Sequence, residues 1–379
     1  MNRILVVSDS FLPRWDGVSR FLYEVIPKLK RDFKITVLAP MFKGNPVPIE
    51  GVDVIRVPLT KIRAGDYQIP RTALRVVSRA VSQADVVWTN TLGPLSVGAC
   101  FFAKLQHKHL LSYVHCIEWE LFHLSIMNSK FLRSIVYWLT KMVARFHYNR
   151  ADLLMVPSEE VAEKLTFAGI KSHKVVIRLG VDINTFKPPK NKIEAKTSIG
   201  LPANSIVIGY CGRFAREKDL KTLRRAFNRL KTTRKECRLL LVGGGLQYLK
   251  DSFSKIKEAI LVGNTDHPQK YYKAMDIFVL PSLTETTGLT VLEAMSSQVA
   301  VVSTPVGISP YIIKNGENGY LFDMGAEYEL YKILDKLVSD RILRERIAKK
   351  GRGIIEKYYS WSQTADKIKE VLTSYTNQE

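Results

Sequence analysis

The sequence predicts an α/β protein made of two doubly wound parallel-sheet domains. Three observations support this: the length of 379 residues, an alternation of short apolar runs with amphipathic stretches, and a second start of that alternation after a proline-rich segment. At about 100–200 residues per domain, the length suggests two domains. Hydrophobic residues make up 46% of the chain and its mean hydropathy is near zero, which is typical of a globular protein.

The first half of the chain alternates from its beginning. The β-rich runs RILVVS and KITVLAP flank the helical stretch GVSRFLYEVIPKLKR, and ADVVWTN, KHLLSYVH and ADLLMVPS follow. Short apolar runs that alternate with helical patterns are typical of buried parallel strands joined by helices. We therefore expect a first Rossmann-like domain over residues 1–187.

The second half repeats the pattern after the segment NTFKPPKNK. Strands are indicated by SIVIGYCG, RLLLVGGG, AILVGN, DIFVLPS and QVAVVSTP, with a helix from about Asp219. Prolines interrupt regular structure, so we place the joint between the domains at Lys187–Lys190. The second domain is expected over residues 188–357.

The chain shows no pattern of secretion or of membrane spanning. Its start, MNRILVVSDSF, reaches Ser and Asp after a brief apolar run, which suits a first strand better than a signal sequence. The apolar stretches at 92–103 and 131–144 are broken well short of about 20 residues. We expect a cytoplasmic protein.

The cysteines have neither metal-like spacing nor the pattern of a disulfide framework. We expect all four to be small core residues: Cys100, Cys116, Cys211 and Cys237.

The net charge of +21 attracts nucleic acid, anionic lipids or phosphorylated substrates. Lysine and arginine are spread over both halves and no nucleic-acid module is recognised, so we predict no nucleic-acid partner. The basic, aromatic-rich stretch KFLRSIVYWLTKMVARFHYNR and the basic RTALRVVSRAV could lie on an anionic membrane. The alternative is a pair of core-packing helices with solvated basic sides.

Functional residues are expected at the strand ends. In doubly wound sheets, ligands bind beyond the carboxyl ends of the strands, where loops enter helices. Residues at such places are Gly17, His115, Arg213, Gly243–Gly245 and Glu285.

The segment CGRFAREKDLKTLRRAF brings two cations close to a helix start. Arg213 leaves a strand, and Lys218 precedes a helix that Asp219 could cap. An Arg fork, a Lys point charge and free helix N–H groups together suit a diphosphate.

The segment ETTGLTVLE places two carboxylates around a glycine. Glu285 follows a strand, and Glu293 is expected in the first turn of a helix that starts near Thr290. Gly288 allows close approach of the backbone to a ligand, and the N–H groups of residues 288–290 point the same way. Carboxylates accept hydrogen bonds from sugar and ribose hydroxyls, so we expect the two glutamates to hold hydroxyls on either side of the phosphates.

Together, CGRFAREKDL, VIRLGVDINTFKP and ETTGLTVLEAM resemble the family 4 retaining glycosyltransferases. Their GT-B fold consists of two Rossmann-like domains facing a cleft. Glu285 and Glu293 match the family's Glu-x7-Glu element, and SYVH ends in the histidine, His115, that the family places by the sugar. YYSWSQTADKI resembles the closing helix, about 358–379, that crosses back to the first domain.

Some positions depart from the family's pattern. The first loop, DSFLPRWDGVSRFLYEV, has Asp16-Gly17 where the family usually has two glycines, and Gln298 stands where glycine is common. None of these departures removes a proposed phosphate or ribose contact.

The resemblance implies a nucleoside-diphosphate sugar as donor, a UDP-sugar or a GDP-sugar, with no further cofactor and no metal. Arg213 and Lys218 would neutralise the diphosphate, Glu293 would hold the ribose and Glu285 the transferred sugar. The chain contains no Asp-x-Asp, which fits metal-independent transfer. The departing phosphate oxygen would take the acceptor's proton on the same face, so that catalysis is chiefly electrostatic.

The remaining residues complete the expected donor site. Backbone groups of Gly288, Leu289 and Thr290 would complete the phosphate cradle, and the region of Gly263 would contact the base. From the first domain, His115 would reach the sugar and Gly17 would let its loop close over the phosphates.

The acceptor is expected to be a membrane lipid or a lipid-linked glycan. Asp-Gly-Val and Glu-Thr-x-Gly-Leu are similar to the branch of the family that makes glycosyl-diacylglycerol and mannosyl-lipids. The protein would then work peripherally on the inner face of the cell membrane. Open alternatives are a soluble saccharide acceptor, a GT-B epimerase or phosphorylase, a glycosidase that uses the two carboxylates, and a non-enzymatic basic binding protein.

Overall fold

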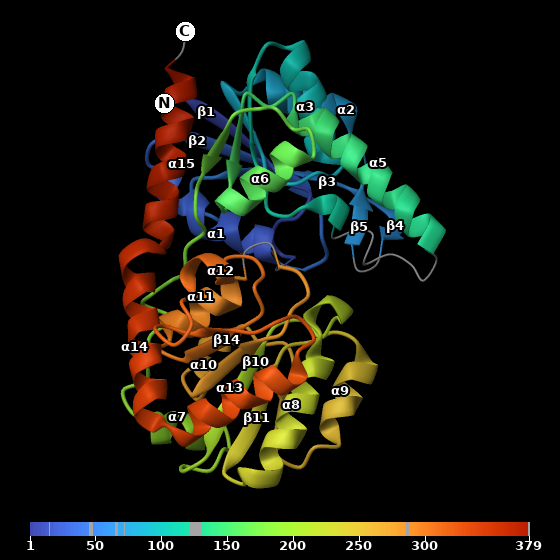
Figure 1. Ribbon diagram of the computed structural model, residues 1–379. Coiled ribbons are helices and arrows are strands. Elements are labelled where there is room, and N and C mark those ends of the chain that lie inside the picture. Colours follow the sequence, from blue (N-terminus) through green and yellow to red (C-terminus); the bar gives the residue numbers. More distant parts are fainter. Residues whose placement is uncertain are drawn as a thin grey trace. The chain divides into compact units, whose positions relative to one another are not determined.

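A computed structural model describes residues 1–14, 16–44, 48–64, 67–71, 73–120, 130–285 and 288–377. The chain forms two compact units (Figure 1). Unit 1 comprises Met1–Leu179 and Trp361–Glu379, and unit 2 comprises Gly180–Ser360.

The division falls earlier in the chain than the sequence-predicted joint after residue 187. The N–H of Val181 donates to the carbonyl of Tyr359 at 2.9 Å, and Phe186 is buried in the core of unit 2. These residues therefore pack with the second unit although they precede the prolines. The C-terminal helix α15, Trp361–Thr376, belongs to unit 1 and lies beside α1, Gly17–Leu29 (Figure 1).

Unit 1 is built on a seven-stranded sheet in the order β3-β2-β1-β6-β7-β8-β9, and all of its strand pairs are parallel. Every residue of β6 and of β8 is buried, as expected for parallel strands covered on both faces. The strands are β1 Arg3–Val7, β2 Lys34–Pro40, β3 Asp53–Val57, β6 Val86–Thr89, β7 His109–Tyr113, β8 Leu153–Val156 and β9 Lys174–Val176.

Helices follow the strands of unit 1, and an antiparallel hairpin is inserted after β3. The helix α1 begins at Gly17 because the carboxylate of Asp16 accepts the N–H groups of Val18 and Ser19 at 3.1 and 3.0 Å. The other elements are the hairpin β4 Leu59–Ala64 and β5 Tyr67–Pro70, and the helices α2 Leu74–Ser82, α3 Pro94–Leu105, α5 Lys130–Tyr148 and α6 Glu159–Phe167.

Unit 2 is built on a six-stranded sheet in the order β12-β11-β10-β13-β14-β15, again with parallel pairs. Every residue of β13 and of β14 is buried. The strands are β10 Ile206–Cys211, β11 Cys237–Val242, β12 Ala259–Val262, β13 Ile277–Leu280, β14 Ala300–Ser303 and β15 Tyr320–Leu321.

The helical elements of unit 2 alternate with these strands. They are α7 Lys192–Thr197, η1 Arg216–Lys218, α8 Leu220–Thr233, α9 Gln247–Ser254, α10 Pro268–Tyr272, α11 Leu289–Ser296, α12 Ser309–Ile312, α13 Glu327–Ser339 and α14 Arg341–Tyr358.

The structure confirms the predicted α/β class, with two doubly wound parallel sheets. Each apolar run that the sequence assigned to a strand forms one. The alternation did not indicate β3, the hairpin of β4 and β5, or the short strands β9 and β15. No residue of β9 or β15 is fully buried, and in β3 only the last residue is.

Backbone conformation corrects the predicted capping role of Asp219 and explains the departure from the family pattern at Gln298. Asp219 does stand at the start of α8, but it has φ 40° and its side chain does not cap the helix; its carboxylate accepts the hydroxyl of Thr222 at 2.6 Å instead. Gln298 has φ 56°, a left-handed conformation that glycine adopts at less cost. This explains why glycine is common there in the family that the chain resembles.

The prediction for the cysteines is correct for two of the four. Cys100 and Cys237 are buried, whereas Cys116 and Cys211 are only partly buried. Cys116 lies shortly after β7, and Cys211 is the last residue of β10. Both are therefore next to loops that leave the sheet.

Candidate functional site

In unit 2 the strand order reverses between β10 and β13, which are neighbours in the sheet. Loops that leave the carboxyl ends of two such strands run to opposite sides and leave a crevice, where doubly wound folds bind ligands. The β10 loop carries Arg213 and Lys218, and the β13 loop carries Glu285. Topology thus places the three predicted residues at one end of the same strand pair.

Lys218 and Glu285 form an ion pair across this reversal point. The Nζ of Lys218 lies 2.5 Å from Oε1 of Glu285, and each side chain is 15% exposed. The hydroxyl of Ser282 donates to the same Oε1 at 3.0 Å. The pair therefore joins a cation suited to phosphate with a carboxylate suited to a hydroxyl, and both still reach the surface.

Arg213 is the more exposed cation, with a side chain that is 62% exposed. Its Nη2 lies 3.0 Å from Oε1 of Glu217, and its carbonyl accepts the hydroxyl of Tyr210 at 2.7 Å. Burial raises the pKa of Tyr210 well above its ordinary value, so this hydroxyl stays protonated and donates. The backbone of Arg213 is thus anchored while its guanidinium extends from the surface.

A backbone hydrogen bond ties the two loops together. The N–H of Leu283, in the β13 loop, donates to the carbonyl of Glu217, in the β10 loop, at 2.8 Å. Glu217 therefore contributes to the site twice, through its carbonyl and through its carboxylate on Arg213. Nothing in the sequence pattern had singled it out.

Gly288 precedes α11 with φ 74° and ψ 52°, a conformation that favours glycine. An added Cβ would have ordinary contacts, the nearest at 3.7 Å from Cδ2 of Leu280, so conformation rather than space requires glycine here. Leu289 and Thr290 are the first two residues of α11. Their N–H groups belong to the four that a helix leaves without an intrahelical partner.

Glu293 lies in the second turn of α11, because the helix begins at Leu289; the expected position in the first turn is wrong. The residue is only 3% exposed, and its Oε2 accepts the hydroxyl of Tyr272 at 2.8 Å. Burial raises the pKa of Tyr272 well above its ordinary value. Tyr272, which the sequence did not indicate, therefore orients this carboxylate.

Glycines shape the neighbouring strand ends. A Cβ at Gly243 would collide with the carbonyl of Gly212, and one at Gly245 with the carbonyl of Phe214, so the β10 and β11 loops approach each other more closely than side chains allow. Gly263, which follows β12, is exposed, and a Cβ there would meet no atom within 4 Å. Its predicted contact with the base stays a prediction.

In unit 1, His115 follows β7 and packs on two aromatic rings. The ring centroids lie 4.7 Å from Phe21 and 4.5 Å from Tyr113, and its Nε2 lies 3.3 Å from Oδ1 of Asn90. Burial lowers the pKa of His115 to about 3, with a smaller opposing effect from the charge of Asp16. The imidazole is therefore neutral at ordinary pH.

Gly17 is the first residue of α1, next to the capping Asp16. The carboxylate of Asp16 already takes the N–H groups of Val18 and Ser19 and accepts the hydroxyl of Ser10. These two N–H groups are not open to a phosphate while Asp16 keeps this arrangement. The predicted closing of the Gly17 loop over phosphates stays a prediction.

The predicted residues therefore fall into two groups. In unit 2, Lys218 of the β10 loop contacts Glu285 of the β13 loop, while Arg213 is paired with Glu217 and Glu293 with Tyr272. Unit 1 places His115 near the Asp16-Gly17 turn. The roles given to them remain predictions. The sequence did not indicate the side chains that hold them. A buried serine, tyrosine or asparagine carries no motif of its own, which applies to Ser282, Tyr272 and Asn90; the partly buried Glu217 likewise belongs to no motif.

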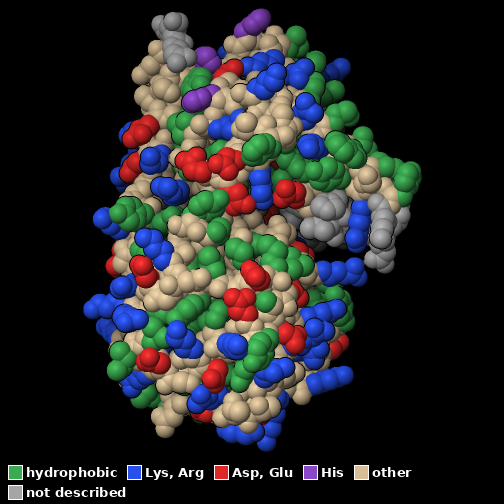
Figure 2. Space-filling model, in the orientation of Figure 1, with side chains coloured by type: hydrophobic (Ala, Val, Ile, Leu, Met, Phe, Trp, Pro, Cys, Tyr) green, Lys and Arg blue, Asp and Glu red, His purple; other side chains and the backbone are tan. Residues whose placement is uncertain are grey.

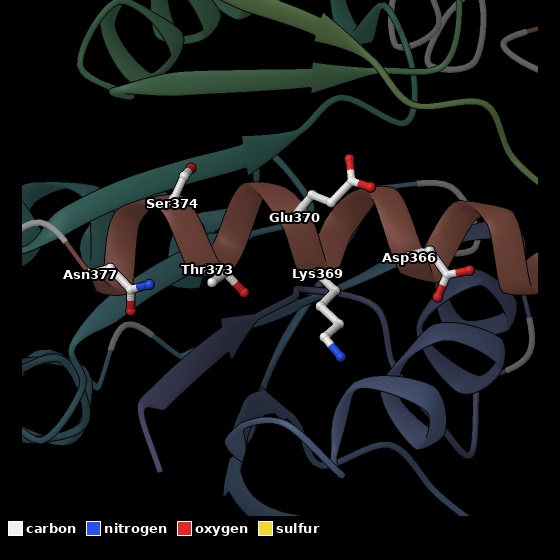
Figure 3. A pocket seen from close by; sticks show the side chains of 6 residues that line it. All are labelled: Asp366, Lys369, Glu370, Thr373, Ser374 and Asn377. Carbon is white, nitrogen blue, oxygen red and sulfur yellow. The ribbon is translucent and has the colours of Figure 1, made fainter.

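Other sites in the described ranges offer less chemistry. No group of three or more His, Cys, Asp or Glu side chains in these ranges is arranged to hold a metal ion. A pocket of about 500 Å³ lies along α15 (Figure 3). Its described lining comes from this helix alone, and Lys369 there is paired with Asp32 at 2.5 Å; no set of polar groups from several elements converges on a ligand. The lining residues are Asp366, Lys369, Glu370, Thr373, Ser374 and Asn377.

Two family models match the chain in succession. Residues 15–185 match Glycosyltransferase Family 4, and residues 191–354 match Glycosyl transferases group 1. The first match lies within unit 1 apart from its last residues, and the second lies within unit 2. Together they leave only short segments unmatched.

Relatives and solved structures agree with these matches. A sulfoquinovosyl transferase of Arabidopsis thaliana is 31% identical over 80% of this chain and 60% of its own length. A GDP-mannose-dependent alpha-(1-6)-phosphatidylinositol monomannoside mannosyltransferase of Mycobacterium tuberculosis is 23% identical over 98% of both chains. The Anabaena protein HepE, solved with UDP and glucose, superposes with a TM-score of 0.81 at 20% identity, over 99% of this chain and 100% of its own.

The likeness to HepE shows that the fold is the GT-B fold. The chain therefore consists of a Glycosyltransferase Family 4 domain followed by a Glycosyl transferases group 1 domain, and it is a glycosyltransferase.

Proposed function

We propose that this protein transfers a sugar from a nucleoside-diphosphate sugar to a membrane lipid or lipid-linked glycan, with retention of configuration and without a metal ion. The Lys218–Glu285 pair at the strand-order reversal of unit 2 carries the proposal. An ammonium group of the kind that suits a phosphate there contacts a carboxylate of the kind that suits a hydroxyl, and doubly wound domains bind nucleotides at such a position.

The two cations would share the diphosphate. The planar guanidinium of Arg213 extends from the surface, where it can form a bidentate contact with phosphate oxygens. The ammonium of Lys218 has three donors, so it can bind a phosphate while it keeps Glu285. The free N–H groups at Leu289 and Thr290 would add donors at the start of α11.

The carboxylates and His115 would hold hydroxyl groups. Glu285, at the rim, would take the transferred sugar, and Glu293, held by Tyr272, would take the ribose. A neutral imidazole both donates and accepts hydrogen bonds, and His115 is kept neutral by burial, which lowers its pKa to about 3. It therefore suits a contact with a sugar hydroxyl and not a charge contact with the phosphates.

The chemical step would need no protein nucleophile. As the bond from the sugar to the phosphate breaks, negative charge grows on the leaving diphosphate, and Arg213 and Lys218 would stabilise that charge. The leaving phosphate oxygen would take the proton of the acceptor hydroxyl as the new glycosidic bond forms on the same face.

Similarity to known proteins supports a UDP-sugar or a GDP-sugar as donor and leaves both open. HepE was solved with UDP and glucose, whereas the Mycobacterium tuberculosis relative is GDP-mannose-dependent. The name of that relative also gives a phosphatidylinositol mannoside as its acceptor, which supports a lipid acceptor here.

The surface of α5 supports the membrane part of the proposal. Large apolar side chains recur along the helix at intervals of three and four residues, and each is between 36% and 75% exposed. They form one stripe on the outer side of the helix, and Figure 2 shows hydrophobic side chains gathered along this edge of unit 1. The stripe consists of Phe131, Ile135, Trp138, Leu139, Met142, Val143 and Phe146.

The charge of this region complements an anionic membrane. The helices α2, α3 and α5 contain no aspartate or glutamate. Lys141 lies over the rings of Tyr137 and Trp138, at 5.7 and 5.4 Å from their centroids, so cations stand beside the stripe. Exposed aromatic and aliphatic residues among cations are typical of helices that lie in a membrane interface. We propose that this face rests on anionic lipids at the inner face of the cell membrane.

Product analysis tests the transfer reaction. The purified protein is incubated with UDP-glucose or GDP-mannose and with lipid extract as acceptor, and the products are resolved by mass spectrometry and NMR. We expect a glycolipid with the anomeric configuration of the donor and slow hydrolysis without acceptor. An epimerised donor, phosphorolysis, or no consumption of any donor would overturn the proposal.

Vesicle sedimentation tests the membrane face. We expect binding to phosphatidylglycerol vesicles and little binding to phosphatidylcholine vesicles, with Trp138→Ala weakening binding about tenfold. Ile342→Ala, which removes an exposed apolar side chain from α14 in unit 2, is the matched control. Equal binding by both variants, or a concentration-dependent dimer of the native protein that Trp138→Ala dissociates, would contradict a membrane face on α5.

A further inference from the structure

We propose that Ser282 is a positioning residue that aims Glu285 at the transferred sugar. In this arrangement, Ser282 and Lys218 hold one carboxylate oxygen of Glu285 and leave the other to accept a sugar hydroxyl. The inference rests on the proposed function. It gives a role to Ser282, a residue to which the family resemblance gave none.

The two donors on Glu285 come from different loops and meet at one atom. Ser282 Oγ donates to Oε1 at 3.0 Å, and Lys218 Nζ lies 2.5 Å from the same oxygen. A carboxylate oxygen offers about two lone-pair directions, so these contacts together fix the rotation of the group. One contact alone would leave the carboxylate free to turn about it.

Ser282 is itself held rigidly. It is fully buried, and its carbonyl accepts the hydroxyl of Thr304, just after β14, at 2.6 Å. The next residue, Leu283, donates its N–H to Glu217 at 2.8 Å. The loops after β10, β13 and β14 therefore all anchor the serine, which keeps its hydroxyl directed at Glu285.

The other oxygen of Glu285 is left for substrate. In the described part of the chain, both contacts assigned to the carboxylate fall on Oε1, and the side chain remains 15% exposed. An ionised carboxylate only accepts hydrogen bonds, so Oε2 suits a hydroxyl group and repels phosphate. Oε1 then stays with Ser282 and with Lys218, the cation that would bind the diphosphate, and Oε2 faces the sugar.

Ser282→Ala tests this assignment, because alanine fits the same buried space. UDP and UDP-glucose, and GDP and GDP-mannose, are titrated by calorimetry, and the pair that the native protein binds is compared in the variant. We expect affinity for the bare nucleotide to stay within about twofold, and affinity for the nucleotide-sugar and kcat to fall about tenfold. Ser205→Ala, which removes a buried hydroxyl from the opposite end of β10, should change neither.

A double-mutant cycle separates positioning from general stability. In a Glu285→Gln background, Ser282→Ala should have much less effect on binding of the nucleotide-sugar, because the two residues act as one unit. Equal losses for nucleotide and nucleotide-sugar, no loss at all, or additive losses in the cycle would overturn the role of Ser282. Failure of the native protein to bind any of the four probes would overturn the proposed function itself.

Discussion

The sheets of the two units have the same kind of strand-order reversal, and each has an acidic residue beside it. The two acids differ in their hydrogen-bond and ion-pair partners. In unit 1, Asp9 follows β1 beside the reversal between β1 and β6. Its carboxylate accepts the N–H groups of Leu95 and Ser96, at 2.9 and 3.2 Å, and the hydroxyls of Thr91 and Ser96. In unit 2, the reversal lies between β10 and β13; Glu285 follows β13, the strand on the other side of the reversal from the one that Asp9 follows in unit 1, and it lies beside a lysine.

The difference teaches that topology alone does not make a functional site. Asp9 is buried, and burial raises its pKa. Its carboxylate accepts hydrogen bonds from Thr91 and from Leu95 and Ser96 in the first turn of α3, so it acts as a structural cap on that helix. Glu285 is shared between a cation and a serine and still reaches the surface. An acid at the reversal point is available to a ligand only where the fold has not already used its oxygens.

The largest expected effect belongs to Glu285. Glu285→Gln removes the charge that would bind the sugar hydroxyl, and we expect the rate of transfer to fall by about two to three orders of magnitude. Affinity for UDP or GDP should hold or rise, because Lys218 loses its competing carboxylate. Steady-state kinetics and calorimetry check this, with Glu317→Gln, an exposed acid of the same unit, as control. Weaker nucleotide binding with normal turnover would break the comparison.

The next effect is on folding and concerns Asp9. Asp9→Ala leaves the buried N–H groups of Leu95 and Ser96 without their acceptor, and we expect the free energy of unfolding to drop by about 3 kcal/mol. Denaturant unfolding measures the loss. At a temperature where the variant is folded, its affinity for UDP or GDP should remain within a few-fold of native. Unchanged stability would mean that Asp9 is not the structural cap described here.

A smaller effect, dependent on pH, is expected at Glu118 in unit 1. This carboxylate is buried and accepts the hydroxyl of Tyr148 at 2.5 Å, and burial raises its pKa to about 7, against the lowering effect of Tyr148 and of Cys116. The folded state therefore holds this proton more tightly than the unfolded state, so the contribution of Glu118 to stability is lost as pH rises through about 7.

Glu118→Gln removes this titration. The free energy of unfolding of the variant, relative to native, should increase by about 2 kcal/mol between pH 5 and pH 8. Using the difference between the two proteins removes the opposing effect of His115 and His147, whose pKa values are lowered by burial to about 3 and about 4. A difference that does not change with pH would show that Glu118 is ionised throughout.

The sequence predicted the fold and the meeting of the main site residues well. Buried parallel strands are short, continuous apolar runs, so β1, β6, β10 and β13 stand out, and topology then requires that Arg213, Lys218 and Glu285 lie at one sheet edge. Motif spacing was enough for this part because it reflects the local sequence of strand, loop and helix.

The supporting contacts could not be predicted in the same way. Tyr272 reaches Glu293 from 21 positions away and Lys218 reaches Glu285 across 67, distances over which no helical or strand periodicity carries information. The capping role given to Asp219 failed because its backbone is left-handed, at φ 40°, whereas a capping residue typically has an extended backbone. The joint was misplaced because Val181 pairs with Ser360, a contact that proline content does not indicate.

Calorimetric titration with UDP and GDP tests the central claim, that the β10 and β13 loops of unit 2 form a nucleoside-diphosphate site. We predict that the native protein binds one of the two, that Lys218→Ala weakens this binding at least about tenfold, and that Lys221→Ala, an equal loss of charge at an exposed position of α8, leaves it unchanged. Binding that is the same in Lys218→Ala, or no binding of either nucleotide by the native protein, would contradict the account.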